Sequence, residues 1–115
     1  MANTFKVITK AGVTSADVIY TVAGSTTTVI LGLMLGNTTS GSVNATVTLG
    51  TDTANRAGAN NEANQDVELL TTTAVPGNTT LDLLSGNKVV METTDTLSVT
   101  GSGALDVALS VMEIT

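Results

Sequence analysis

The chain of 115 residues contains no histidine, no cysteine and no tryptophan, and it has one proline, one phenylalanine and one tyrosine. Without cysteine or histidine it can build neither a disulfide framework nor a zinc or haem site on those ligands. Phe5 and Tyr20 alone cannot form a stacking platform for sugars or bases. We therefore expect no cofactor, no metal and no catalytic residue.

Charged residues are also scarce, at 12% of the chain against about 25% in an average globular domain. The net charge of -6 would be repelled by nucleic acid phosphates and by an anionic lipid surface, so we expect neither partner. Residues 29–35 form the longest apolar run, far short of the ~20 residues that a membrane-spanning helix needs. Residues 1–6 lack the apolar core of a secretory signal, which predicts a soluble protein that is not exported.

What the chain does contain is threonine and valine in alternating order, which suits a pleated sheet better than a helix. Residues 43–49 alternate strictly between apolar and polar, as in a strand with one face in a core and the other in water. Turn residues recur at short spacing between such segments. We predict one domain over residues 1–115, an all-β antiparallel sandwich of the jelly-roll or immunoglobulin-like kind, with about eight short strands.

Two of the expected strands break the simple alternation. Residues 29–35 are apolar at both parities, which predicts a central strand covered on both faces, with Gly32 marking a bulge or a close crossing. In residues 105–114 the apolar side chains change parity at Met112. A bulge, or a strand that passes from one sheet to the other, would explain that change.

Residues 51–65 form one long polar segment without any large apolar side chain. Long loops in compact domains are often functional, and the alternatives here are a mobile hairpin tip or an arm that contacts a neighbouring subunit. Arg56 is one of only four cations in the chain, which makes the segment a candidate contact region. The expected contact residues are Ala2, Asn3, Thr4, Phe5 and Lys6 at the N-terminus and Arg56, Asn60, Asn61 and Glu62 in this segment.

Asp52-Thr53-Ala54 is similar to the Asp-Thr-Gly/Ala signature of aspartic proteases, whose dimeric members are all-β chains of similar length. Such enzymes hold two aspartates about 3 Å apart in a loop braced by buried strands. Here the residues around Asp52 are polar, so a homodimeric protease using Asp52 is the weaker alternative. Glu62, Asp66 and Glu68 lie close together in sequence, but their spacing matches no calcium-binding loop.

Much of the chain resembles small virion structural proteins of tailed phages, particularly those that infect marine cyanobacteria. The segments that carry the resemblance are residues 1–6, 18–22, 25–33, 37–39, 75–81, 84–92 and 110–114. The resemblance implies a structural component of a virion, and its motifs are not catalytic. Residues 51–65 depart from the family pattern because they form a longer and more polar segment.

From the resemblance and the composition we expect a capsid decoration, or cement, protein rather than an enzyme. It would bind the major capsid protein on the outer surface of the head, after synthesis in the host cytoplasm, as a homotrimer. A protein that binds only the assembled lattice stabilises it by mass action. The alternative keeps the chain in the virion as a tail, baseplate or fibre component.

Overall fold

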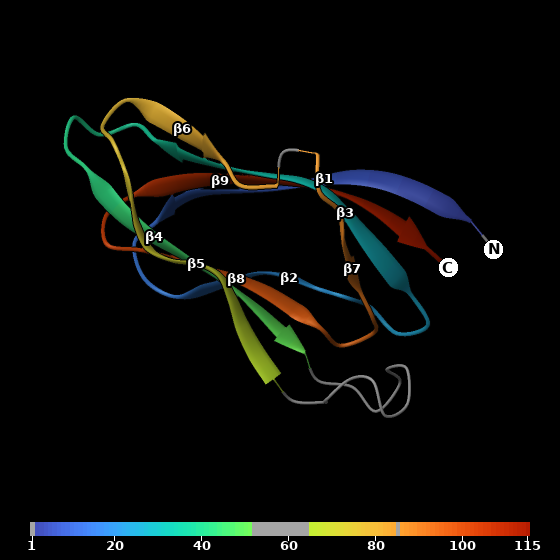
Figure 1. The fold of residues 1–115 in the computed structure, drawn as a ribbon. Helices are drawn as coiled ribbons and strands as arrows, with labels where there is room; N and C mark the ends of the chain where they lie inside the picture. Colours follow the sequence, from blue (N-terminus) through green and yellow to red (C-terminus); the bar gives the residue numbers. More distant parts are fainter. Residues whose placement is uncertain (1, 52–64, 85) are drawn as a thin grey trace.

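The computed structural model describes residues 2–51, 65–84 and 86–115, which form nine strands in two antiparallel sheets packed as a sandwich (Figure 1). The described residues contain no helix. The chain ends lie side by side, because Ala2 and Thr115 exchange backbone hydrogen bonds of 3.2 and 3.0 Å. The predicted all-β antiparallel sandwich is confirmed, with nine strands instead of about eight.

Sheet A has five strands and sheet B has four. Sheet A runs in the order β1-β9-β3-β6, and β7 also pairs with β3; its strands are β1 (Asn3–Val13), β9 (Leu105–Ile114), β3 (Thr27–Asn37), β6 (Thr79–Asp82) and β7 (Val89–Met91). Sheet B runs in the order β2-β8-β4-β5, with β2 (Asp17–Thr21), β8 (Thr96–Gly101), β4 (Val43–Thr51) and β5 (Gln65–Val75). Apart from the short β7, this is the strand order of an eight-stranded jelly roll.

The core lies between the two sheets and takes aliphatic side chains from both of them. Every second residue of β9 from Leu105 to Val111 is buried, and Leu97 and Val99 of β8 oppose them from sheet B. The alternation of threonine with valine or leucine produces this arrangement, since successive side chains of a strand point to opposite faces. The inward residues form the core and the threonines of β4 and β8 are left on the outer face of sheet B.

The central strand β3 differs from its prediction on one face. Its register with β9 shifts between Ile30 and Gly32, which confirms the bulge predicted at this point. Ile30, Leu33 and Leu35 are fully buried on the inner face, but Met34 on the outer face is 46% exposed. The described residues therefore cover the outer face of β3 only in part, and the prediction of coverage on both faces is wrong at Met34.

The parity change in β9 has a different cause from the two that the sequence predicted. β9 stays in sheet A, and its pairing with β1 is regular from Asn3 opposite Ile114 to Lys10 opposite Val107. The register shifts beside it belong to β1 and β3, so β9 itself has no bulge. The change instead marks the point where inward positions become polar and outward positions become apolar.

Candidate interaction surface

At one end of sheet A the usual distribution of side chains is inverted across three neighbouring strands. Lys6 of β1, Thr28 of β3 and Glu113 of β9 lie on the inner face, which faces sheet B. The residues next to them in sequence, Phe5, Val29 and Met112, lie on the outer face. Polar groups are thus inside and apolar groups outside, the reverse of what a solvated sheet face requires.

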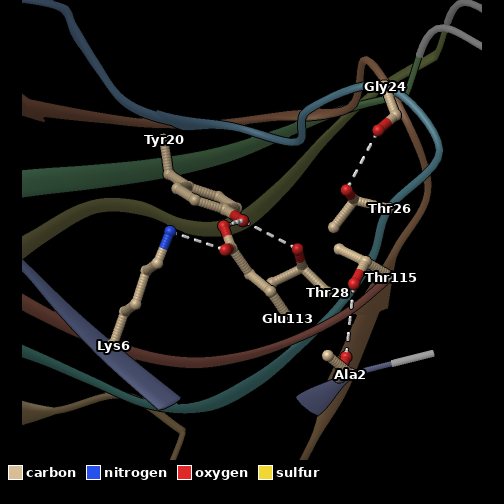
Figure 2. A network of polar contacts seen from close by, with 8 residues as sticks. All are labelled: Ala2, Lys6, Tyr20, Gly24, Thr26, Thr28, Glu113 and Thr115. Atoms are coloured by element: carbon tan, nitrogen blue, oxygen red, sulfur yellow. Dashed lines mark hydrogen bonds and ion pairs between the residues drawn. The ribbon is translucent and has the colours of Figure 1, made fainter. Parts of the chain in front are cut away.

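The inner polar groups bind one another and Tyr20 of sheet B (Figure 2). The Tyr20 hydroxyl donates to Glu113 Oε2 at 2.5 Å and lies 2.7 Å from Thr28 Oγ1, and Lys6 Nζ is 2.7 Å from Glu113 Oε1. Both oxygens of the carboxylate are therefore engaged. The cluster joins β1 and β9 of sheet A to β2 of sheet B at the end where aliphatic packing stops.

The protonation states of this cluster follow from its geometry. Burial of Tyr20 raises the pKa of its hydroxyl to about 12, and the hydrogen bond to Glu113 acts in the same direction. The hydrogen bond from Lys6 lowers the pKa of the Glu113 carboxyl, and the bond from Tyr20 lowers it further. At neutral pH the cluster therefore holds an ion pair and a neutral phenol, an arrangement that ties strands together.

Four apolar side chains cross the outer face of sheet A in one continuous row, which we call the apolar row: Phe5, Met112, Val29 and Val90. Phe5 is opposite Met112, Met112 is opposite Val29, and Val29 is opposite Val90. Phe5 is 70% exposed and Val90 is 52% exposed. An apolar patch of this extent on an outer face is typical of an interaction site.

Within β1, β9 and β3, the rows on either side of the apolar row are also uncharged. One contains Asn3, Ile114 and Thr27, and the other contains Val7, Ser110 and Gly32. Farther along the face lie two hollows of about 400 Å³ and 270 Å³, both lined by Met34 and Ala108. The acidic residues of this face, Asp82 and Asp106, lie at that more distant end.

The outer face of sheet B is built differently. Its matching row, which we call the polar row, contains Val18, Ser98, Thr48 and Glu68, each opposite the next. Glu68 accepts a hydrogen bond of 2.8 Å from the Thr71 hydroxyl, and Thr46 and Thr100 form a further polar pair beside the row. This face is that of an ordinary solvated sheet.

The predicted contact residues divide between described and undescribed parts of the chain. Ala2 precedes β1, and Asn3, Thr4, Phe5 and Lys6 lie within it, so the predicted N-terminal contact segment is a strand that pairs with β9. Arg56, Asn60, Asn61 and Glu62 lie outside the described residues, as does Asp52. The ends of the predicted loop, Thr51 and Gln65, belong to β4 and β5 and pair with each other.

The described residues offer little for metal chemistry. They include no cluster of three or more aspartate, glutamate, histidine or cysteine residues placed to hold an ion. Asp66 and Glu68 lie on β5, opposite Gly50 and Thr48 of β4. No helix in the described part of the chain is long and apolar enough to span a membrane.

The apolar row is not predicted from the sequence, although two of its residues have an unusual position in their strands. The sequence shows the change of parity at Met112, and it shows that Val29 begins a segment that is apolar at both parities. Both are outward residues of the row, and they become neighbours only when β9 and β3 pair. The inward cluster was missed because Lys6, Tyr20 and Glu113 are far apart in sequence.

Comparisons with known proteins add little to this description. No protein-family model matches the sequence, and no curated protein matches it. Among solved structures, a chain from the study "Bacillus endospore appendages form a novel family of disulfide-linked pili" aligns with a TM-score of 0.49 at 14% identity, covering 99% of this chain and 87% of that one.

Proposed function

We propose that this chain is a structural protein of a phage virion that decorates the outer surface of the head and stabilises the capsid. The observation that carries the proposal is the uncharged apolar face of sheet A around Phe5, Met112, Val29 and Val90. The resemblance of the sequence to small virion proteins of tailed phages is the reason for proposing a phage virion as the particle. Jelly rolls occur in viral capsid proteins among others, which is compatible with the proposal at the level of fold analogy.

The partner surface in this proposal is the major capsid protein, and the apolar row is the centre of the contact. Burial of a large apolar side chain contributes about 1.5–3 kcal/mol, and this row has two such side chains more than half exposed. Few ions need to lose their hydration when the row is covered, because the apolar row and the neighbouring residues of β1, β9 and β3 on this face carry no charged side chain. The interface would thus be an apolar centre with polar margins.

Capsid stabilisation follows if the contact exists only on the assembled lattice. Binding at concentrations far above the dissociation constant stabilises the bound state by about 3–4 kcal/mol per site. Repetition over the many equivalent sites of a head would multiply that effect. We propose a trimer as the decorating unit, since capsomers meet around three-fold axes and a trimer can present three copies of the apolar row at once.

The test is binding of the purified protein to expanded heads assembled without it, followed by thermal disruption of the heads. We expect saturable binding and a higher disruption temperature. Val90→Asp should abolish binding, because it places a charge in the apolar row. Val18→Asp is the matched control, since Val18 is 56% exposed against 52% for Val90 and lies on the other sheet.

Absence of binding to heads, together with intact folding of the protein, would reject the decoration proposal. Binding to tails or baseplates instead would support the alternative location in the virion. Copy number separates the two locations, since a decorated head carries far more copies than a tail or baseplate.

A further inference from the structure

The edge of β1 that does not pair with β9 shares only Phe5 with the apolar row, and it carries an inference that does not rest on the proposed function. β1 is the outermost strand of sheet A, and β9 pairs with one side of it. Eight consecutive residues, from Asn3 to Lys10, pair with β9 without interruption. The other side of this segment faces no strand of the described chain.

The direction of each backbone group along β1 follows from the pairing at its start. Ala2 and Thr115 exchange two hydrogen bonds, so they form a hydrogen-bonded pair of the antiparallel ladder. Such pairs alternate with pairs that are not hydrogen bonded to each other. Because the register is regular, Thr4, Lys6 and Ile8 point their N–H and C=O groups toward β9, and the residues between them, Asn3, Phe5, Val7 and Thr9, point these groups away from it.

Two of the residues whose backbone groups point away from β9 also have exposed apolar side chains. Phe5 is 70% and Val7 is 63% exposed, and both lie on the outer face of sheet A. A strand added at this edge would therefore satisfy backbone donors and acceptors and cover part of two apolar side chains in one step. Strand addition of this kind is a general mode of recognition.

The other sheet edges in the described chain are shorter or less regular than residues 3–10 of β1, whose two edge charges, Lys6 and Lys10, are each paired with a carboxylate of the same chain. β6 and β7 have four and three residues, and β2 has five with a register shift. β5 is as long as β1, but its pairing with β4 is irregular, Thr72 has φ of 44°, and Asp66 and Glu68 lie along it. Short strands, irregularities and like charges are the usual means of preventing strand addition.

We propose that the occupant of this edge is β1 of a second copy of the chain, paired antiparallel about a two-fold axis at Val7. This register places Val7 opposite Val7 of the other copy and Phe5 opposite Thr9. All of these residues point their backbone groups outward, so each N–H and C=O meets its counterpart. The two-fold axis is perpendicular to the sheet, so the outer faces of both copies lie on the same side.

The charges of β1 also fit a second copy. β1 contains Lys6 and Lys10 and no acidic residue, in a chain whose net charge is -6, so this strand contributes none of the negative charge that would repel a second copy. With the axis at Val7, Lys6 lies opposite Ile8 and Lys10 opposite Thr4, so no lysine directly opposes another. Each lysine also has a carboxylate in its own chain, Glu113 at 2.7 Å for Lys6 and Asp17 at 3.3 Å for Lys10.

The contact predicts an even number of copies in solution, a dimer or, where the proposed trimer also forms, a hexamer. Val7→Pro removes an outward N–H that β9 does not use, so the fold should persist while pairing between copies is lost. Val7→Thr keeps the N–H and the branched side chain and is the matched control. Analytical ultracentrifugation of the full chain over a concentration series measures the dissociation constant of the contact between copies. We expect this constant to be at least about tenfold higher for Val7→Pro than for Val7→Thr.

A cysteine substitution tests the register directly, because the natural chain has no cysteine. Residues opposite each other in a hydrogen-bonded pair have Cα atoms about 5.5 Å apart, within the range of a disulfide. Val7→Cys should therefore crosslink to a dimer under mild oxidation, and Phe5→Cys should not. This second measurement stands even if Val7→Pro fails to fold.

A strictly monomeric or trimeric natural chain at high concentration, without crosslinking through Val7→Cys, would overturn the proposal. Crosslinking through Phe5→Cys in place of Val7→Cys would overturn the register. These experiments need no phage heads. Their failure would therefore leave the decoration proposal standing, and failure to bind heads would leave the pairing of β1 standing.

Discussion

The outer faces of the two sheets show how differently the same β-rich composition can be used. Across sheet B the polar row runs Val18, Ser98, Thr48 and Glu68, whereas across sheet A the apolar row runs Phe5, Met112, Val29 and Val90. Both rows cross four strands of a sandwich that packs its other faces into one core. Because sheet B folds with a polar outer face, we expect that sheet A does not need its apolar outer face in order to fold.

The inner faces differ in the opposite sense. Behind the apolar row, sheet A carries Lys6, Thr28 and Glu113, which bind Tyr20, whereas Leu97 and Val99 lie behind the polar row in sheet B. A sheet that places its charged groups inside and its apolar groups outside keeps a surface free for a partner. Substitutions on each face should therefore separate folding from association.

The largest effect on stability should come from the inner face of β9. Leu109 is fully buried, so Leu109→Ala should lower the free energy of unfolding by about 2–5 kcal/mol through the lost contacts and the cavity left behind. Met112→Ala, on the outer face of the same strand, should cost less than about 1 kcal/mol. Chemical denaturation of both variants checks this, and equal costs would show that the outer face also contributes to folding.

The next largest effect should come from the polar cluster. Glu113→Gln removes the ion pair with Lys6 and weakens the bond from Tyr20, which should cost about 1–2 kcal/mol at neutral pH. Because the pKa of Glu113 is lowered in the fold, its contribution is present above the unfolded value of about 4.3 and is lost as the pH falls through the folded value.

The measurement for Glu113 is chemical denaturation at several pH values, in which the natural chain and Glu113→Gln should converge under acidic conditions. Glu68→Gln in the exposed polar row is the control and should stay within about 0.5 kcal/mol of the natural chain. If Glu68→Gln cost as much as Glu113→Gln, the contrast between the two carboxylates would be wrong.

Ionisation of the Tyr20 hydroxyl should lower the stability of the fold at alkaline pH. Its pKa is raised to about 12, so the protonated phenol contributes stability that is present below the unfolded value of about 10 and is lost as the pH rises toward 12. Tyr20 is the only tyrosine and there is no tryptophan, so ultraviolet absorbance reports its ionisation alone. Titration at the ordinary value would contradict the buried hydrogen-bonded hydroxyl, and Tyr20→Phe should lack the alkaline decline.

The smallest change in stability should come from exchanging the characters of the two rows. Val90→Thr and Thr48→Val should each alter the free energy of unfolding by no more than about 0.5 kcal/mol, because both side chains lie on outer faces. Head binding should nevertheless weaken in Val90→Thr and remain unchanged in Thr48→Val. Equal binding by both variants would show that the apolar row is not the contact.

Much of the fold could be predicted from local pattern. The alternation in residues 43–49 predicted β4, and the apolar run with Gly32 predicted β3 and its bulge. β1 was missed as a strand, since its residues 3–10 place Lys6 and Lys10 at inward positions where a core residue is expected. Local pattern fails there because the inward position is filled by an ion pair with Glu113 and not by aliphatic packing.

An all-β sandwich follows from the sequence alone, because β-branched residues in alternation with polar ones can bury only one face of each strand. The sequence also excludes chemistry that depends on histidine or cysteine, since neither residue is present. Strand pairing in the folded chain, by contrast, brings Phe5, Met112, Val29 and Val90 into one row and makes β1 an edge strand of sheet A among the described residues. The physical reason is that rows and edges are created by pairing between strands distant in sequence, and no local pattern specifies which strands meet.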